Sequence, residues 1–177
     1  LEEGWHTFEI RARYFSGAEQ EINYAFNFYV DAIQGQSLRL SPPYQEIAID
    51  ASCDFDIWLE EVDNWSGGRI TLVWEGSKAY ISTYQIHDQI FDILMQNNSS
   101  LVSRVDQYAD SLVIDLGLVD DLPNGISGSG RIATVRFQPL ISPDFLEIGF
   151  GSSCDFVNAI NQSIPIAEIP GGLVVYK

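Results

Sequence analysis

The feature of this chain that most limits its fold is a series of short segments in which apolar and polar residues alternate. In the clearest of them, Phe55, Ile57 and Leu59 are separated by the single residues Asp56 and Trp58. Successive side chains of a β-strand point to opposite faces, so this alternation predicts strands with one buried face and one outward face. Many such segments without a long amphipathic helix favour an all-β fold, an antiparallel β-sandwich.

The strands of this sandwich are expected to follow one another from residue 37 to the end of the chain. Glycine and proline mark the turns, at Pro42-Pro43, at Ser66-Gly67-Gly68 and between Gly125 and Gly130. The segment Asp88–Met95 breaks the alternation and predicts a short helical turn. The pattern is that of a jelly-roll-like sandwich of about nine strands. The candidate strands are Ser37–Leu40, Glu46–Ile49, Phe55–Glu60, Arg69–Trp74, Ala79–Ile86, Leu101–Tyr108, Leu112–Leu118, Arg131–Leu140, Leu146–Phe150 and Leu173–Tyr176.

The first part of the chain predicts an extra N-terminal β-hairpin. Alternation places Phe8, Ile10, Ala12 and Tyr14 on one face of the first strand, and an aromatic-rich second strand follows at Tyr24–Val30. A hairpin alone is only marginally stable in water, so we expect it to pack on the sandwich or on a neighbouring chain. The predicted domains are therefore residues 1–33 for the hairpin and residues 37–177 for the sandwich.

Charge excludes several classes of partner. The chain has 25 Asp and Glu against nine Lys and Arg, which gives a formal net charge of −16. Binding to nucleic acid or to anionic membranes requires clustered Lys and Arg, so neither is expected. No apolar run approaches the ~20 residues of a membrane helix. The chain begins with Leu1, without a basic signal-peptide region, and we expect it to come from a longer protein.

The two cysteines leave two interpretations open. Cys53 and Cys154 each lie in the tetrapeptide Ser-Cys-Asp-Phe, and neither has a histidine or a second cysteine at metal-ligand spacing. They either form a disulfide across a loop of ~100 residues or are two buried thiols. No metal or cofactor is expected.

Three stretches of the sandwich carry a family resemblance. They are Ser37–Pro42 followed by Phe55–Leu59, then Trp65–Glu75, and finally the glycine-led strand Gly128–Phe137. Together they resemble a cohesin domain, over about residues 37 to 177. The Tyr-Asp-Pro that usually ends the second of these stretches is Trp74-Glu75-Gly76 here. The resemblance implies a non-catalytic module for protein–protein recognition of a dockerin-type partner, or for attachment, in an extracellular or cell-surface bacterial protein.

The N-terminal hairpin carries a second resemblance. Leu1-x-x-Gly4-x-His6-x-Phe8-x-Ile10-Arg11-Ala12 and Phe28–Ala32 are similar to the last two strands of a bacterial immunoglobulin-like domain. The resemblance implies that most of that domain lies upstream of Leu1.

Motifs that would carry catalysis or bind a cation are weak. Glu60 and Glu61 are adjacent in an expected strand and point to opposite sides, so they do not form a glycosidase pair. Neither His6 nor His87 lies in a nucleophile motif, and both are expected to be structural or solvated. One loop offers hard oxygen ligands for calcium, although a solvated acidic loop fits the same residues, Asp120, Asp121 and Asn124. The Asn-x-Ser sequences at Asn64, Asn98 and Asn161 are consistent with exposed turns.

A binding face remains the best candidate site. Cohesins bind a partner module through one face of a sheet, and the resemblance places this face on Arg69–Val73, Leu101–Tyr108 and Leu112–Leu118. Its outward residues are expected to be Arg69, Thr71, Val73, Val113 and Asp115. The alternative is a carbohydrate-binding module of related fold that binds polysaccharide on coplanar aromatic side chains, with Trp58, Trp65 and Tyr80 as candidates.

Overall fold

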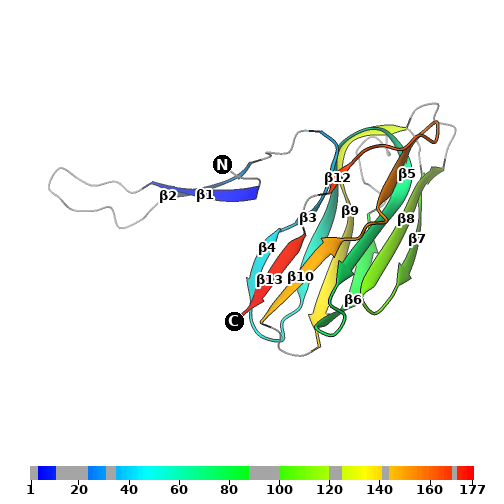
Figure 1. The fold of residues 1–177 in the computed structure, drawn as a ribbon. Helices are drawn as coiled ribbons and strands as arrows, with labels where there is room; N and C mark the ends of the chain where they lie inside the picture. The colour runs from blue at the N-terminus through cyan, green and yellow to red at the C-terminus, as the bar shows by residue number, and fades with distance from the viewer. Residues whose placement is uncertain are drawn as a thin grey trace. The chain divides into compact units, whose positions relative to one another are not determined.

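The structure is a computed structural model that divides into two compact units, Leu1–Gln34 and Gly35–Lys177. It describes residues 4–10, 24–30, 35–87, 100–119, 125–140, 144–168 and 171–177. The first unit contains an antiparallel hairpin of β1 (Gly4–Ile10) and β2 (Tyr24–Val30), in which Phe8 lies opposite Phe26 (Figure 1). The predicted hairpin is confirmed. Phe8, Ile10 and Phe26 are exposed within it.

Where the second unit is described, its regular secondary structure is all β-strand, which confirms the predicted all-β class. Two of its strands, β5 and β9, are much longer than the others (Figure 1). The strands are β3 (Ser37–Ser41), β4 (Tyr44–Ile47), β5 (Cys53–Trp74), β6 (Ala79–Ile86), β7 (Ser100–Gln107), β8 (Ser111–Val119), β9 (Ile126–Pro139), β10 (Phe145–Phe150), β11 (Asp155–Asn158), β12 (Ala167–Glu168) and β13 (Gly172–Tyr176).

The long strand β5 joins the two layers of the sandwich. Its first half pairs with β3 and β9, and its second half pairs with β8 on one side and with β10 and β11 on the other. One layer has the order β12-β3-β5-β9-β6, and the other has the order β7-β8-β5-β10-β13-β4. Among the described strands of this unit, only the pairs β12–β3 and β13–β4 are parallel. The predicted antiparallel β-sandwich is confirmed.

The prediction of two separate strands, Phe55–Glu60 and Arg69–Trp74, is wrong because the chain stays extended between them. β5 bends from one layer into the other between Leu59 and Trp65. The bend coincides with register shifts in its pairing with β9 and with the positive φ angles of Glu61 and Asn64. Gly67 and Gly68 are not turn residues. They allow neighbouring strands to approach, since a Cβ on Gly67 would lie 2.7 Å from the Leu116 carbonyl oxygen.

Other predicted boundaries also need correction. The segment expected as a turn between Gly125 and Gly130 belongs to β9 from Ile126 onward, where it continues the pairing with β5. The strand expected at Glu46–Ile49 is β4, which begins at Tyr44 directly after Pro42-Pro43. β11 and β12 were not predicted. The helical turn expected at Asp88–Met95 lies outside the described residues.

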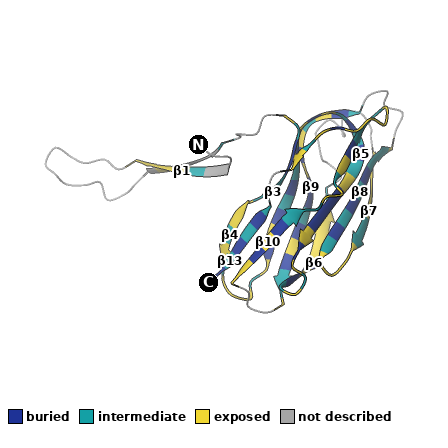
Figure 2. Cartoon of the chain, in the orientation of Figure 1, coloured by how far each residue is buried: buried dark blue, intermediate teal, exposed yellow. Residues whose placement is uncertain are grey.

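The core lies between the two layers, where buried residues of most strands alternate with more exposed ones (Figure 2). Phe55, Ile57 and Leu59 are fully buried, as their alternation predicts. Phe137 of β9 makes edge contacts with Phe55 of its own layer and with Trp74 of the other layer, at ring-centroid distances of 6.2 and 5.2 Å. Over the described residues, no helix has the length and hydropathy of a membrane span.

Candidate partner-binding face

The predicted binding residues lie together on the outer face of the second layer. Arg69 of β5 lies opposite Asp115 of β8, and Thr71 lies opposite Val113. Val73 is the next outward residue of β5, and it is 37% exposed. Because neighbouring strands place directly opposed side chains on the same face, these residues lie on one side of the sheet, which we call the β5–β8 face.

A bidentate ion pair lies at the centre of the β5–β8 face. Arg69 Nε donates to Asp115 Oδ1 at 2.6 Å, and its second nitrogen donates to Oδ2 at 3.0 Å. Hydrogen bonding from the guanidinium lowers the pKa of Asp115. A second pair, Arg104–Asp106 on β7, lies beside it with N and O 2.9 Å apart. Both ion pairs are partly exposed, so their polar atoms are accessible to a partner.

Thr71 does not take part in this surface as predicted. Its side chain is 7% exposed, because the segment between β10 and β11 lies over it. Thr71 Oγ1 is 2.8 Å from Ser153 Oγ, and the amide of Gly151 donates to the Thr71 carbonyl oxygen at 2.7 Å. The exposed part of the predicted set is therefore Arg69 and Val73, with Val113 and Asp115 partly exposed.

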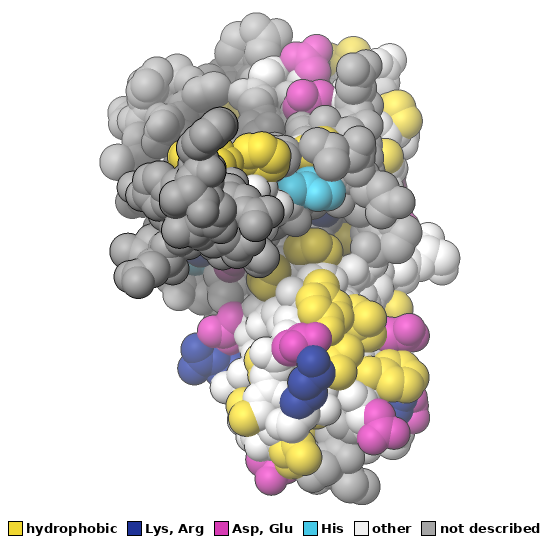
Figure 3. Space-filling model, turned by 90° about the vertical axis from the view of Figure 1, so that its left-hand side faces the viewer, with side chains coloured by type: hydrophobic (Ala, Val, Ile, Leu, Met, Phe, Trp, Pro, Cys, Tyr) yellow, Lys and Arg dark blue, Asp and Glu magenta, His cyan; other side chains and the backbone are white. Residues whose placement is uncertain are grey.

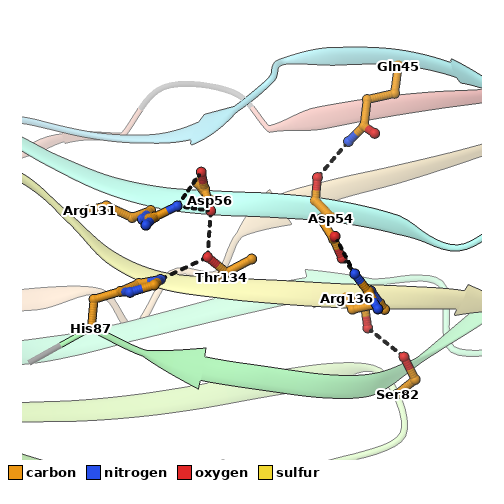
Figure 4. A network of polar contacts seen from close by, with 8 residues as sticks. All are labelled: Gln45, Asp54, Asp56, Ser82, His87, Arg131, Thr134 and Arg136. Atoms are coloured by element: carbon orange, nitrogen blue, oxygen red, sulfur yellow. Dashed lines mark hydrogen bonds and ion pairs between the residues drawn. The ribbon is translucent and has the colours of Figure 1, made fainter.

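The outer face of the first layer has a different character. A polar network joins β5, β6 and β9 across this face (Figure 4). Arg136 binds Asp54 through two contacts of 2.7 Å, which lower the pKa of that carboxyl group. Asp56 accepts from Thr134 Oγ1 at 2.6 Å and pairs with Arg131 at 3.2 Å. These arginines and carboxylates satisfy one another within the sheet.

The aromatic residues expected to form a carbohydrate platform do not form one. Trp65 is fully buried in the core. Trp58 is partly buried on the outer face of the first layer, and the guanidinium of Arg39 lies over its ring at 5.4 Å. Tyr80 is exposed on β6. The three rings therefore present no common exposed plane.

The residues considered for catalysis are engaged in structural contacts. Glu60 pairs with Arg39 at 2.6 Å, and Glu61 accepts the amide of Gly35 at 2.7 Å. His87 Nε2 is 2.9 Å from Thr134 Oγ1. No cluster of three or more His, Cys, Asp or Glu is found in the part of the chain that the structure describes. The acidic loop with Asp120, Asp121 and Asn124 lies outside that part, as does Asn98.

The remaining Asn-x-Ser sites and His6 belong to local structure. Asn64 Oδ1 accepts the amide of Gly125 at 2.6 Å, and Asn64 takes a positive φ of 56° within β5. Asn161 is exposed and has a positive φ of 65°. His6 is a partly buried residue of β1. Asn64 therefore lies in a strand and is partly buried, rather than in the exposed turn that its sequence suggests.

Cys53 and Cys154 are free thiols in the structure, which is the second of the two interpretations that the sequence leaves open. Cys53 is buried in the core beside Tyr176, and burial raises its pKa to about 11. Cys154 lies on the β5–β8 side, where the amide of Thr71 donates to its sulfur at 3.4 Å. Burial raises the pKa of Cys154 to about 11 as well.

These pKa values predict that both thiols are unreactive in the folded protein. At pH 8 a thiol with a pKa of about 11 is ionised to roughly one part in a thousand, and the thiolate is the nucleophile. We expect iodoacetamide to label neither cysteine at pH 8 without denaturant, and to label both in guanidinium without reductant. Mass spectrometry measures the label. A denatured chain that takes no label until it is reduced would mean that Cys53 and Cys154 form a disulfide.

Comparison with known proteins establishes the fold. No protein-family model matches the sequence, and no curated protein matches it. The sixth cohesin of scaffoldin B from Acetivibrio cellulolyticus, solved in complex with a mutant Cel5 dockerin, matches with a TM-score of 0.62 and 14% identity over 81% of this chain and 100% of that chain. A type II cohesin from the adaptor scaffoldin ScaA of the same organism matches with a TM-score of 0.63 and 10% identity, over 80% of this chain and 90% of its own. A non-cellulosomal cohesin from Archaeoglobus fulgidus gives a TM-score of 0.58 at 14% identity, over 81% and 91% of the two chains. This chain therefore has a cohesin-like fold.

Proposed function

We propose that the second unit is a non-catalytic module that binds a dockerin-type protein partner through the β5–β8 face. The observation that carries the proposal is the cohesin-like fold, since several of the matching cohesins were solved in complex with dockerins. The predicted residues Arg69, Val73 and Asp115 support it, because they form an exposed surface with an apolar side chain beside a bidentate ion pair.

The same proposal includes the location of the module. We propose that it belongs to an extracellular or cell-surface protein. The N-terminal hairpin would be the end of an immunoglobulin-like domain, and its exposed Phe8, Ile10 and Phe26 would be covered by the rest of that domain, by the sandwich or by a neighbouring chain. A carbohydrate-binding role is the second candidate. It is less well supported, because Trp65 lies in the core and Trp58 lies beneath Arg39.

The proposal is tested by calorimetric titration of the full chain against a panel of dockerin modules and a panel of soluble polysaccharides. We expect saturable binding of at least one dockerin and none of a polysaccharide. Saturable polysaccharide binding with no dockerin binding would overturn the proposal in favour of the second candidate.

A matched pair of double variants tests the location of the binding face. Arg69→Ala with Asp115→Ala removes the ion pair of the β5–β8 face, and Asp54→Ala with Arg136→Ala removes a bidentate pair of similar exposure from the opposite layer. Exposed ion pairs contribute about 1 kcal/mol or less to folding, so both double variants are expected to fold. We expect the first to weaken dockerin binding at least tenfold and the second to change it less than twofold. The reverse order would exclude the β5–β8 face.

A further inference from the structure

A groove of about 550 Å³ adjoins the β5–β8 face, where β5, β10 and β13 lie side by side. On β10, Gly149 lies opposite Val73 of β5. Two residues earlier on the same strand, Glu147 lies opposite Leu173 of β13. The floor is low at Gly149 of β10, which has no side chain. Gly171 and Gly172 allow the strands beneath to pack closely: a Cβ on Gly171 would lie 1.4 Å from the Ile148 carbonyl oxygen, and one on Gly172 would point into the core, 2.1 Å from the Phe55 ring. The groove is thus built into the strand packing.

One end of this groove already binds a cation of the chain itself. The ammonium group of Lys78 lies 4.2 Å from the centre of the Phe145 ring and 2.9 Å from Glu75 Oε2. Hydrogen bonds from Lys78 and Ser77 lower the pKa of Glu75. The wall therefore combines an aromatic face with a carboxylate, the combination that attracts an ammonium or guanidinium group.

The other carboxylate of the groove belongs to Glu147 of β10. Among the described residues, the Glu147 carboxylate makes no ion pair and no hydrogen bond, and it lies beside the apolar side chain of Leu173. The net charge of −16 adds a long-range field that favours cationic ligands. Acidic and basic side chains also lie next to exposed hydrophobic ones on the neighbouring surface that contains β4 and β13, where Lys177 pairs with Glu46 at 2.7 Å (Figure 3).

We infer that the groove between Val73 and Leu173 binds an arginine or lysine side chain of the protein partner, with Glu147 as its counter-ion. The aliphatic part of that side chain would lie on Val73 and the glycine floor, and the cationic group would reach Glu147. A sugar ring fits less well, because Lys78 already occupies a face of the Phe145 ring. The inference rests on the proposed function for its partner class, since the groove shares Val73 with the β5–β8 face.

The first test uses a peptide probe, so that it does not depend on finding the partner. The full chain, labelled with ¹⁵N, is titrated with acetyl-Leu-Arg-Leu-amide and with the same peptide carrying neutral citrulline. We expect millimolar binding that shifts the amides of Gly149, Gly171 and Gly172, at least fivefold tighter for arginine than for citrulline. Equal affinities, or shifts elsewhere on the molecule, would overturn the inference.

Three variants sharpen the result. Glu147→Gln keeps the side-chain shape and should weaken arginine-peptide binding about fivefold, whereas Glu168→Gln, which removes an exposed carboxylate of β12, should leave it unchanged. Gly149→Val fills the groove in a place where a Cβ meets only Val73 Cγ2, at 3.9 Å, and should abolish peptide binding in a folded protein. Equal affinity of the Glu147→Gln variant and the original chain would contradict the assignment of Glu147.

The same variants separate this inference from the proposed function. If a dockerin binds the original chain and the Glu147→Gln variant equally well, the groove inference fails while the proposed function stands. If no dockerin binds but the arginine peptide does, the proposed partner class fails and the groove remains a cation-binding subsite.

Discussion

Replacing Trp65 by alanine is expected to lower the free energy of unfolding by about 3–5 kcal/mol, the cost of deleting a large buried aromatic side chain. Trp65 is fully buried in the middle of β5, where that strand passes from one layer to the other. The loss would leave a cavity between the layers. Urea denaturation followed by far-UV circular dichroism measures the change.

Trp58→Ala is the matched control, since Trp58 lies on the same strand but on its outer face. The side chain is partly buried and contacts Arg39, so we expect a loss of about 1 kcal/mol. If Trp65→Ala does not fold, Trp65→Phe provides a milder test with an expected loss of about 1–2 kcal/mol. Equal stability losses for Trp65→Ala and Trp58→Ala would mean that Trp65 is not a core residue.

Gly172→Ala is expected to destabilise the fold by about 3 kcal/mol, through overpacking rather than through a cavity. The added methyl group would lie 2.1 Å from Phe55, whose ring is fully buried and packed against Phe137. The ring therefore has little space into which to move. Thermal unfolding measured by calorimetry reports the loss.

Gly149→Ala is the control for this substitution, because it adds the same methyl group to the neighbouring strand. Its nearest heavy atom would be Val73 Cγ2 at 3.9 Å, which is an ordinary contact, so the change should stay within about 0.5 kcal/mol. A stable Gly172→Ala variant would show that β13 does not pack against Phe55 as described.

Sequence alternation predicted the strands well because a β-strand has a fixed period of two. Phe55, Ile57 and Leu59 had to share one face once the segment was extended, and they are buried together. The same reasoning failed for glycine, which occurs both in turns and where neighbouring strands approach closely. Gly67 and Gly68 resemble a turn in the sequence, but they lie between tightly packed strands, and only the tertiary structure separates these roles.

The candidate face was predicted in part for a similar reason. Register alone places Arg69 and Asp115 on one face, and the structure joins them in a bidentate ion pair. Thr71 follows the same alternation, but it is covered by Gly151 and Ser153, which lie about eighty residues further along the chain. No local pattern predicts such a contact. Trp65 lies between the two segments predicted as strands, so their alternation did not assign it a face, and the structure places it in the core.

The most direct test of the proposed recognition is to map the bound face by ¹H–¹⁵N chemical shifts, with a dockerin that binds the full chain in calorimetry. If the partner binds the β5–β8 face, the amide signals of Arg69, Val73 and Asp115 will shift most at saturation. The amide signals of Asp54 and Arg136 on the opposite layer will not shift. Shifts concentrated at Asp54 and Arg136, with Arg69 and Asp115 unchanged, would contradict the account.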